Sequence, residues 1–355
     1  MARVTLQTVA DRVGVSRMTV SNAFSKPDQL SAALRQRILA AADELGYVGP
    51  DPAARALARG TSGAVGVLLT ESLTYAFTDE VATGFLGAIA DELAPTGVAL
   101  TLLSTSQSED LVPARDVALD GALVYSCDGE SPALAWLIRR GLPLVFVDQT
   151  PAPGIPSVNV EDRQGARAAA AHLVALGHRN IGILSKGMAG PFDVIVEADA
   201  DSDADHHVSR QRMLGWLDAL HDAGIRPSVV RQPHSGHDGA GTAARLLLRQ
   251  PDPPTAILCF SDVMAEGVVH AAEQLGLRVP EDLSVVGFDD SSLARRMRPA
   301  LTTVRQPIEQ KGRAAAAALT ASIERSRSTI AKSRARHLLL PTELVVRDST
   351  APPSR

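Results

Sequence analysis

The chain begins with three stretches in which apolar residues recur every three or four positions, which is the period of a helix with one buried face. The stretches cover residues 6–13, 17–24 and 31–45. Gly14 ends the first helix and Ser16 is placed to cap the second, so this pair predicts a helix-turn-helix. With the third helix it forms a small trihelical unit, which can present its second helix to a DNA major groove.

A shorter helix is expected at residues 51–60. Asp51 can cap it, Pro52 suits its first position and Gly60 ends it. Two turns without a core are unstable in water, so we expect this helix to be ordered only when a second copy of the chain or a DNA groove packs against it.

From residue 61 onward, short apolar runs alternate with helical patterns. Strands are predicted at 65–69, 98–103, 122–124, 144–147, 157–160, 181–184, 256–260 and 283–286. Helices are predicted at 81–93, 133–140, 163–176, 211–223, 240–250 and 262–275. This alternation predicts an α/β core of parallel sheets in two similar lobes, the periplasmic-binding-protein architecture, with a ligand crevice at the carboxyl ends of the strands.

The composition is that of an ordinary globular protein, with 45% hydrophobic and 21% charged residues. A chain of 355 residues is expected to form two or three domains. Cys127 and Cys259 lie in apolar runs and are too few for a disulfide scaffold. No signal region and no run of the ~18 apolar residues that span a membrane is visible, so we expect a cytoplasmic protein that binds no membrane.

The charge is unevenly distributed. Residues 1–60 carry eight Arg and Lys against five Asp and Glu, a net +3, and the remainder carries 27 against 35, a net −8. A mildly basic head on an acidic body fits a small DNA-contacting module attached to a regulatory domain, although chance variation over a short segment explains the numbers equally well.

An ordered set of motifs resembles the LacI/GalR family of transcriptional regulators. In the head they are Val4-Thr5-Leu6, Val9-Ala10, Gly14-Val15-Ser16, Thr19-Val20-Ser21, the run from Ala41 to Tyr47, and Ala56-Leu57 after Pro52. In the body they are Gly177-His178-Arg179, the runs from Gln274 to Pro280 and from Val285 to Asp290, and Leu301-Thr302-Thr303-Val304. The resemblance covers nearly the whole chain and implies a DNA-binding regulator.

By this resemblance, Arg17, Met18 and Asn22 occupy the positions from which the second helix reaches base edges. Arg17 suits guanine, Asn22 suits adenine, and Met18 offers apolar contact to a thymine methyl. Many family members carry Arg where Asn22 stands, so the operator should differ at that base pair. Exposed surface without base contact is the alternative for each residue.

Other polar side chains of the head suit phosphate oxygens, which position a protein on DNA without specifying sequence. These are Thr5, Ser16, Thr19 and Ser21, together with Asn22. Arg55 adds charge in the hinge, and Leu57 matches a leucine that in relatives wedges into the minor groove. Packing of Leu57 against a dimer mate is the alternative.

Candidate effector contacts lie in the body. Asp148, Asp262 and Asp289 follow predicted strands, and Arg212 matches an arginine that often faces the effector in relatives. Carboxylates with one arginine suit a hydroxyl-rich ligand. The alternatives are a helix cap for Asp262 and a hinge-stabilising role for Asp289.

Two aromatics, Tyr75 and Phe77, could form a platform for a sugar ring or simply fill the core. The pairs His206 with His207 and His234 with His237 lack a supporting metal-ligand pattern, and we interpret them as surface histidines. A short Gly-Ala-Gly at 239–241 lacks the rest of a dinucleotide motif. No metal and no cofactor are therefore expected.

Four segments are expected: a helix-turn-helix domain at 1–48, a hinge helix and linker at 49–61, a two-lobed effector-binding and dimerisation core at 62–347, and a flexible tail at 348–355. The resemblance implies a homodimer that binds a pseudo-palindromic operator in double-stranded DNA. No heptad repeat suggests a tetramer.

The expected effector is a sugar or sugar derivative, with a nucleoside or purine as the second class. It is expected to act as an inducer that relieves repression, and corepression is the alternative. Two other functions stay open: a cytosolic solute-binding protein that reads no DNA, and an α/β enzyme, although no local catalytic motif is visible.

Overall fold

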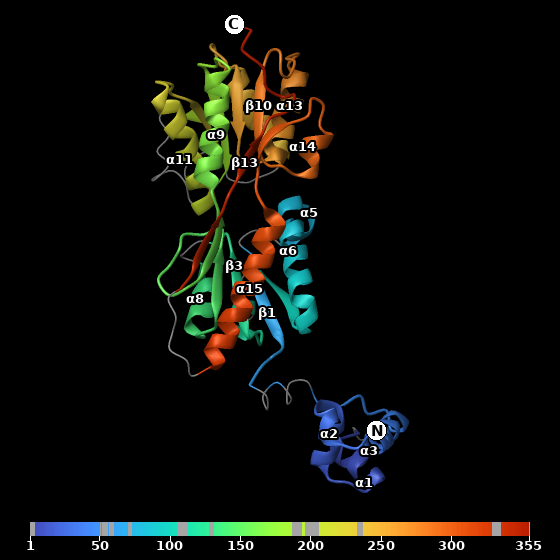
Figure 1. Cartoon of the computed structure of the whole chain (residues 1–355). Helices are drawn as coiled ribbons and strands as arrows, with labels where there is room; N and C mark the ends of the chain where they lie inside the picture. Colours follow the sequence, from blue (N-terminus) through green and yellow to red (C-terminus); the bar gives the residue numbers. More distant parts are fainter. Residues whose placement is uncertain are drawn as a thin grey trace. The chain divides into compact units, whose positions relative to one another are not determined.

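The computed structural model of the chain describes residues 4–49, 51, 56, 60–69, 73–104, 112–127, 131–186, 194–195, 206–232, 237–328 and 335–354 (Figure 1). The chain divides into two compact units, Met1–Gly63 and Ala64–Arg355. Among the described residues, the first unit contains only helices, and the second contains both sheets.

The first unit is built from α1 (Leu6–Val13), α2 (Arg17–Ser25), the 3-10 turn η1 (Pro27–Gln29) and α3 (Ala32–Glu44). Thr5, Ser16 and Ser31 each cap a helix, because their hydroxyl oxygens accept hydrogen bonds from backbone N–H groups three residues later. Gly14 ends α1 with a φ of 77°, which favours glycine. The buried core consists of Val9, Ala10, Val20, Ala23, Ile38 and Ala42. The predicted helix-turn-helix is confirmed.

Little of the predicted hinge helix is described. Ala56 is helical, and the Thr61 N–H donates to the Ala56 carbonyl at 3.2 Å. Arg55 and Leu57 lie outside the described residues, so their roles stay predictions.

The second unit contains two sheets, one in each lobe (Figure 1). In spatial order, the first sheet contains β12 (His337–Leu340), β5 (Ser157–Val160), β4 (Leu144–Val147), β3 (Gly121–Tyr125), β1 (Ala64–Leu69) and β2 (Ala99–Ser104). The second contains β13 (Glu343–Val345), β11 (Thr302–Arg305), β10 (Ser284–Asp289), β9 (Ala256–Cys259), β6 (Ile181–Lys186), β8 (Ser228–Gln232) and β7 (Val194–Ile195). Neighbouring strands are parallel except in the pairs β11–β13 and β7–β8. Two lobes with parallel sheets are thus confirmed.

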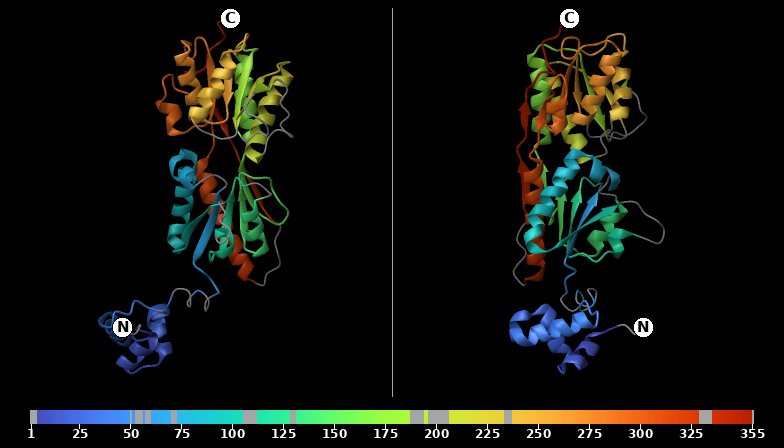
Figure 2. Two further views of the ribbon diagram at one scale, coloured as in Figure 1. Left: turned by 180° about the vertical axis from the view of Figure 1, so that it is seen from behind. Right: turned by 90° about the vertical axis from the view of Figure 1, so that its right-hand side faces the viewer.

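Helices cover both sheets (Figure 2). The first lobe has α5 (Leu73–Thr78), α6 (Glu80–Leu93), η2 (Ala94–Thr96), α7 (Pro113–Asp116), α8 (Pro132–Arg139) and α15 (Ile308–Arg327). The second lobe has α9 (Asp162–Ala175), α11 (His207–Asp222), α12 (His237–Leu248), α13 (Asp262–Gln274) and α14 (Ser292–Arg296).

The chain passes between the lobes three times, after β5, after β11 and after β12. The second passage leads into α15, which lies along α6 in the first lobe (Figures 1 and 2). The sequence pattern does not predict α15, because the side that it buries is formed by Lys311, Gly312, Ala315, Ala316 and Leu319, only one of them a large apolar residue. Because α15 packs in the first lobe, Lys311 lies beside Asp148, which lines the cavity described below.

The predicted flexible tail at 348–355 is wrong for the residues that are described. Ser349 is buried, and its carbonyl accepts from the Val285 N–H at 2.9 Å. The Ala351 N–H donates to Ser284 Oγ at 3.0 Å. These bonds continue along the second lobe beside β10, so residues 348–354 belong to the folded body.

Candidate functional site

The exposed face of α2 carries the predicted base-reading residues. Arg17 is exposed, and Met18, although apolar, has 72% of its surface accessible. Asn22 is half buried on the same helix. Arg17 and Met18 are therefore accessible to a partner that docks on this face of α2.

The short hydroxyl side chains of the head have structural duties. Thr5 caps α1, and Ser16 Oγ accepts from the Thr19 N–H at 3.1 Å while it also lies 2.8 Å from Thr19 Oγ1. Ser21 is half buried, and its carbonyl accepts from Ser25 Oγ at 2.8 Å. A capping oxygen accepts from the backbone through a lone pair, so its O–H group can still donate to a phosphate oxygen, and these placements leave the predicted phosphate contacts possible.

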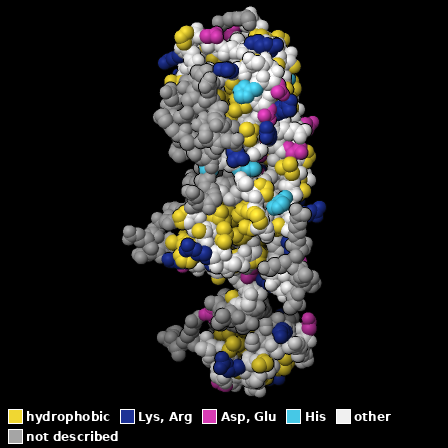
Figure 3. All heavy atoms as spheres, turned by 90° about the vertical axis from the view of Figure 1, so that its left-hand side faces the viewer, with side chains coloured by type: hydrophobic (Ala, Val, Ile, Leu, Met, Phe, Trp, Pro, Cys, Tyr) yellow, Lys and Arg dark blue, Asp and Glu magenta, His cyan; other side chains and the backbone are white. Residues whose placement is uncertain are grey.

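Charge alone does not locate the functional surfaces. On the face drawn in Figure 3, basic and acidic side chains are interspersed among the coloured residues of the second unit. Buried polar groups and their geometry distinguish the candidate sites better than surface charge does.

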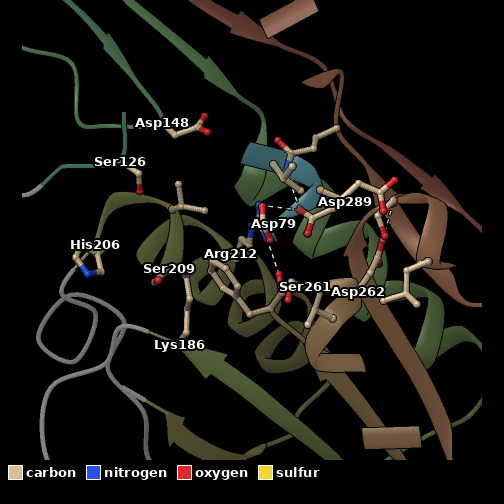
Figure 4. Close-up of a pocket in the computed structure, with 18 of the residues that line it drawn as sticks. Asp79, Ser126, Asp148, Lys186, His206, Ser209, Arg212, Ser261, Asp262 and Asp289 are labelled. Atoms are coloured by element: carbon tan, nitrogen blue, oxygen red, sulfur yellow. Dashed lines mark hydrogen bonds and ion pairs between the residues drawn. The ribbon is translucent and has the colours of Figure 1, made fainter. Parts of the chain in front are cut away.

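A cavity of about 390 Å³ lies between the two lobes. Its lining includes Tyr125, Ser126 and Asp148, which lie at or just beyond strand ends in the first lobe, and Phe260 and Asp289, which do so in the second. In parallel α/β sheets the carboxyl ends of the strands are the usual place for a ligand. Figure 4 shows Asp148 and Arg212 on facing sides of this space.

Asp148 is held by a buried lysine. Lys311, 1% exposed, donates through Nζ to Asp148 Oδ2 and to Gln306 Oε1, the latter at 2.9 Å. Its ammonium group also lies 5.7 Å from the centre of the Tyr125 ring. Asp148 Oδ1 is buried and has no hydrogen-bond partner among the described residues. The carboxylate is thus fixed through one oxygen, while the other can accept a hydrogen bond from a ligand.

Arg212, on α11, is almost wholly committed to its protein partners. Its Nε donates to Asp162 Oδ1 at 2.8 Å, its Nη1 donates to the Phe260 carbonyl at 2.5 Å, and its Nη2 lies 3.6 Å from Asp289 Oδ1. The guanidinium carbon lies 3.6 Å from the centre of the Phe288 ring. Two carboxylates and an aromatic face compensate for the desolvation of this cation.

Three hydrogen bonds hold the Asp262 carboxylate. Its Oδ1 accepts from Thr303 Oγ1 at 2.5 Å, and its Oδ2 accepts from the N–H and Oγ of Ser291, both at 2.8 Å. Burial raises the pKa of Asp262 to about 6, although these hydrogen bonds act in the opposite direction. Asp262 lines the cavity but serves chiefly to join the loop after β10 to β11.

Asp289 lies at a position that is compatible with both of its predicted roles. It lines the cavity, and its Oδ1 accepts from Gln306 Nε2 at 2.7 Å, at the passage between the lobes. Burial raises the pKa of Asp289 to about 8, an effect that the nearby Arg212 only partly offsets. Burial thus favours the protonated form of Asp289 more than it would for an ordinary aspartate, whereas Arg212 favours the carboxylate.

The backbone is strained at the cavity. Among the described residues, the non-glycine residues with positive φ are Ser126 (48°), Asp148 (52°), Asp289 (120°) and Asp290 (54°). Three of these four line the cavity. Such conformations persist only where the surrounding fold enforces them, and they cluster at binding sites.

Of the two residues of the predicted aromatic platform, only the side chain of Phe77 is described, and it does not line the cavity. Phe77 is 69% exposed and is not part of the cavity lining. The side chain of Tyr75 lies outside the described residues. Among the described residues, aromatic surface of the cavity comes from Tyr125, at the end of β3, and from Phe260, just after β9.

Hydrogen bonds join the lobes beside the cavity. The N–H and Oγ of Ser292, at the start of α14, donate to the two carboxylate oxygens of Glu80 at 2.8 and 3.0 Å. Elsewhere, Thr150 Oγ1 lies 3.1 Å from His207 Nδ1. Burial lowers the pKa of His207. These contacts hold the lobes in the arrangement described.

The described histidines form no metal centre. No group of three or more His, Cys, Asp or Glu side chains among the described residues could hold a metal ion. His206 lines the cavity and His207 bonds Thr150, whereas His234 and the side chain of His237 lie outside the described residues. A search of the described helices finds none long and apolar enough to cross a membrane.

Sequence reasoning missed several groups around the cavity, namely Asp79, Asp162, Ser209, Gln306 and Lys311. Ser209 Oγ is buried in the lining and has no hydrogen-bond partner among the described residues. It precedes Arg212 by three residues on α11, so the helical spacing from Arg212 could have identified it. The sequence also contains a signal for Lys311, because a lysine at a core-facing position of a helix needs a buried partner.

Two family models match the chain. Residues 5–49 match the description "Bacterial regulatory proteins, lacI family", and residues 170–350 match "Periplasmic binding protein-like domain". The first match covers α1 to α3, and the second covers most of the second lobe with the return through α15.

Named relatives extend the match over the chain. The HTH-type transcriptional regulator IpsA of Corynebacterium glutamicum is 40% identical over 319 residues, 87% of this chain and 88% of that protein. The lac repressor dimer bound to operator and the anti-inducer ONPF gives a TM-score of 0.78 at 27% identity, covering 99% of this chain and 100% of that one. A CelR–cellobiose complex gives a TM-score of 0.69 at 28% identity, covering 98% and 100%.

Proposed function

Because this chain belongs to the LacI family of bacterial transcriptional regulators, we propose that it is a repressor whose operator affinity is controlled by a small molecule bound between its lobes. One observation carries the proposal: the chain that bears the DNA-reading head also bears a cavity lined by buried, strained polar groups from both lobes. Family membership sets aside the enzyme and the solute-binding protein that reads no DNA.

We assign base reading to Arg17, Met18 and Asn22, with phosphate contacts from Thr5, Ser16, Thr19 and Ser21 and hinge contacts from Arg55 and Leu57. The exposure of Arg17 and Met18 supports this assignment. One head covers one half-site, so a homodimer on a pseudo-palindromic operator follows. The dimer in the related lac repressor structure supports this arrangement, and an operator in the chromosome implies a cytoplasmic location.

The cavity favours an uncharged, hydroxyl-rich effector. Arg212 is occupied by Asp162, Asp289 and the Phe260 carbonyl, so it offers little to a phosphate or carboxylate. Within the described part of the chain, Asp148 Oδ1 and Ser209 Oγ have no hydrogen-bond partner, so they can engage hydroxyl groups. A sugar or sugar derivative fits this set, and the related CelR complex contains cellobiose.

We propose that the effector acts as an inducer. Asp148 belongs to one lobe and Asp289 and Arg212 to the other, so a ligand that contacts them changes the relative stability of lobe arrangements. A difference of a few kcal/mol in its affinity for the two arrangements is enough to change operator occupancy strongly.

The test is selection of bound duplexes from a random DNA pool by the purified full-length protein near physiological salt, with unrelated duplex as competitor. Enrichment of a two-fold-symmetric site supports the proposal and supplies an operator for effector screening. Failure to enrich any motif, with and without a panel of sugars to supply a corepressor, would contradict it.

A further inference from the structure

A hydrogen bond joins two side chains of the head beside the proposed base-reading surface. Asn22 Nδ2 donates to Gln29 Oε1 at 3.2 Å. Asn22 is half buried in α2, and Gln29 is the exposed last residue of η1. No described partner is recorded for Asn22 Oδ1 or for the second Nδ2 hydrogen, so both remain available to a base.

The backbone between the two residues is well fixed. The Lys26 N–H donates to the Asn22 carbonyl at 2.8 Å, and the Gln29 N–H donates to the Lys26 carbonyl at 3.1 Å. Pro27, between them, has a restricted φ. Arg35 Nε donates to the Ala23 carbonyl at 3.2 Å and ties α3 to the end of α2. These backbone bonds place residue 29 beside Asn22 irrespective of which side chain residue 29 carries.

We propose that Gln29 is a specificity-determining positioning residue, which fixes the plane and polarity of the Asn22 amide toward one base pair of each half-site. The inference rests on the proposed base-reading role of Asn22. Gln29 itself needs no contact with the base.

The chemistry of the amide explains why such a partner matters. An asparagine amide turned by 180° exchanges its donor and its acceptor. Adenine presents N7 as an acceptor and N6 as a donor, so a bidentate contact requires one polarity. While Gln29 Oε1 accepts one Nδ2 hydrogen, turning the Asn22 amide alone would break this bond, so the bond favours the orientation of Asn22 that matches the Gln29 amide. DNA binding removes water from the pair, which strengthens this preference.

The test compares variants of the full-length protein by random-DNA selection, followed by affinities for operators with single base-pair changes. Gln29→Met matches the length of glutamine but cannot accept the hydrogen bond. We expect it to reduce discrimination at the base pair read by Asn22 about fivefold, which corresponds to roughly 1 kcal/mol, and to leave other base pairs nearly unchanged.

Two variants serve as controls. Gln29→Glu keeps an acceptor, so it should retain the preference at that base pair while binding every operator more weakly, because its charge repels phosphates. Gln36→Met makes the same change as Gln29→Met at an exposed position of α3 and should alter no preference.

The variant Asn22→Ala distinguishes a failure of base reading by Asn22 from a failure of positioning by Gln29. A variant Asn22→Ala with unchanged preferences at every base pair would refute base reading by Asn22, and the inference with it. Suppose that Asn22→Ala weakens the preference at one base pair. Positioning by Gln29 is then wrong if Gln29→Met leaves the preference at that pair unchanged, weakens the preference at a different pair, or weakens binding to all sites equally. Base reading by Asn22 would stand in each of these cases. In the double variant, Gln29→Met should cause no further loss at that pair.

Discussion

The proposed DNA contacts and the proposed effector contacts are held in opposite ways. On α2, Arg17 and Met18 are exposed and project from a helix that is stabilised by other residues. At the cavity, Arg212 and Asp148 are buried and are held by buried partners, Arg212 by Asp162 and Asp148 by Lys311. A substitution of Arg17 or Met18 can therefore change DNA specificity at little cost in stability. A substitution of a buried side chain at the cavity also removes contacts that stabilise the fold.

The largest effect is expected from Lys311→Met. The variant leaves the Asp148 carboxylate buried without its cation, and loss of one partner of a buried pair costs about 3–5 kcal/mol. Urea unfolding should show this loss in the free energy of unfolding, and adding Asp148→Asn should restore part of it.

Arg313→Met is the matched control on the same helix, since Arg313 is half exposed and pairs only with Glu309 among the described residues, at 3.4 Å. Its effect should stay within about 0.5 kcal/mol. Equal effects of the two variants would mean that burial of Lys311 has no special energetic role.

Gly287→Ala should come next. An added Cβ would lie 2.4 Å from Asp262 Oδ1 and 2.7 Å from Leu301 Cδ2, so Asp262, with its hydrogen bonds, and the Leu301 side chain must shift. We expect a loss of about 1–3 kcal/mol in thermal or urea unfolding. Gly87→Ala is the control in α6, where nothing lies within 4 Å of the added atom, and it should stabilise the helix by about 0.5–1 kcal/mol. A tolerated Gly287→Ala would contradict the tight packing described here.

Arg17→Ala tests the other side of the comparison. Discrimination at one base pair should fall by about 1–3 kcal/mol, whereas the free energy of unfolding should change by no more than about 0.5 kcal/mol, because Arg17 is exposed. Operator affinities and urea unfolding on the same preparation check both parts. A large loss of stability would show that the head is no more tolerant of change than the cavity.

The smallest effect concerns pH. The folded-state pKa of Asp289, about 8, exceeds that of an ordinary aspartate, so between those values the folded state binds more protons than the unfolded state. Stability should therefore fall as pH rises toward 8. Between about pH 6.5 and 7.5, Asp289→Asn should make this slope shallower by up to about 1.4 kcal/mol per pH unit. Parallel stability curves for the two proteins would contradict the raised pKa.

Local sequence signals predict the helices of the head and the ends of strands, whereas they do not predict which distant residues meet at the cavity. The caps at Ser16 and Ser31 and the glycine at Gly14 are local signals, so the helices of the head were predictable within a residue or two. The strand ends at Asp148 and Asp289 were predictable for the same reason, since an apolar run ends where a polar residue follows.

The partners of these residues were not predictable from local pattern. Lys311 lies 163 residues after Asp148, and the two meet only because the chain returns to the first lobe through α15. Asp162 and Arg212 likewise meet across 50 residues. The prediction of a flexible tail was wrong for a related reason. The polar, proline-containing sequence of the tail suggests fraying, but Ser349 and Ala351 form hydrogen bonds to residues 64 and 67 positions earlier.

The most direct test of the account is the operator affinity of the purified protein with a panel of neutral sugars and with the phosphate ester of each sugar that acts. We predict that at least one neutral sugar weakens operator binding by about tenfold or more, in the usual range of allosteric coupling, that its phosphate ester does not, and that Asp148→Asn abolishes the response while retaining operator binding. Stronger action by the phosphate esters, or an undiminished response in Asp148→Asn, would contradict control through this cavity.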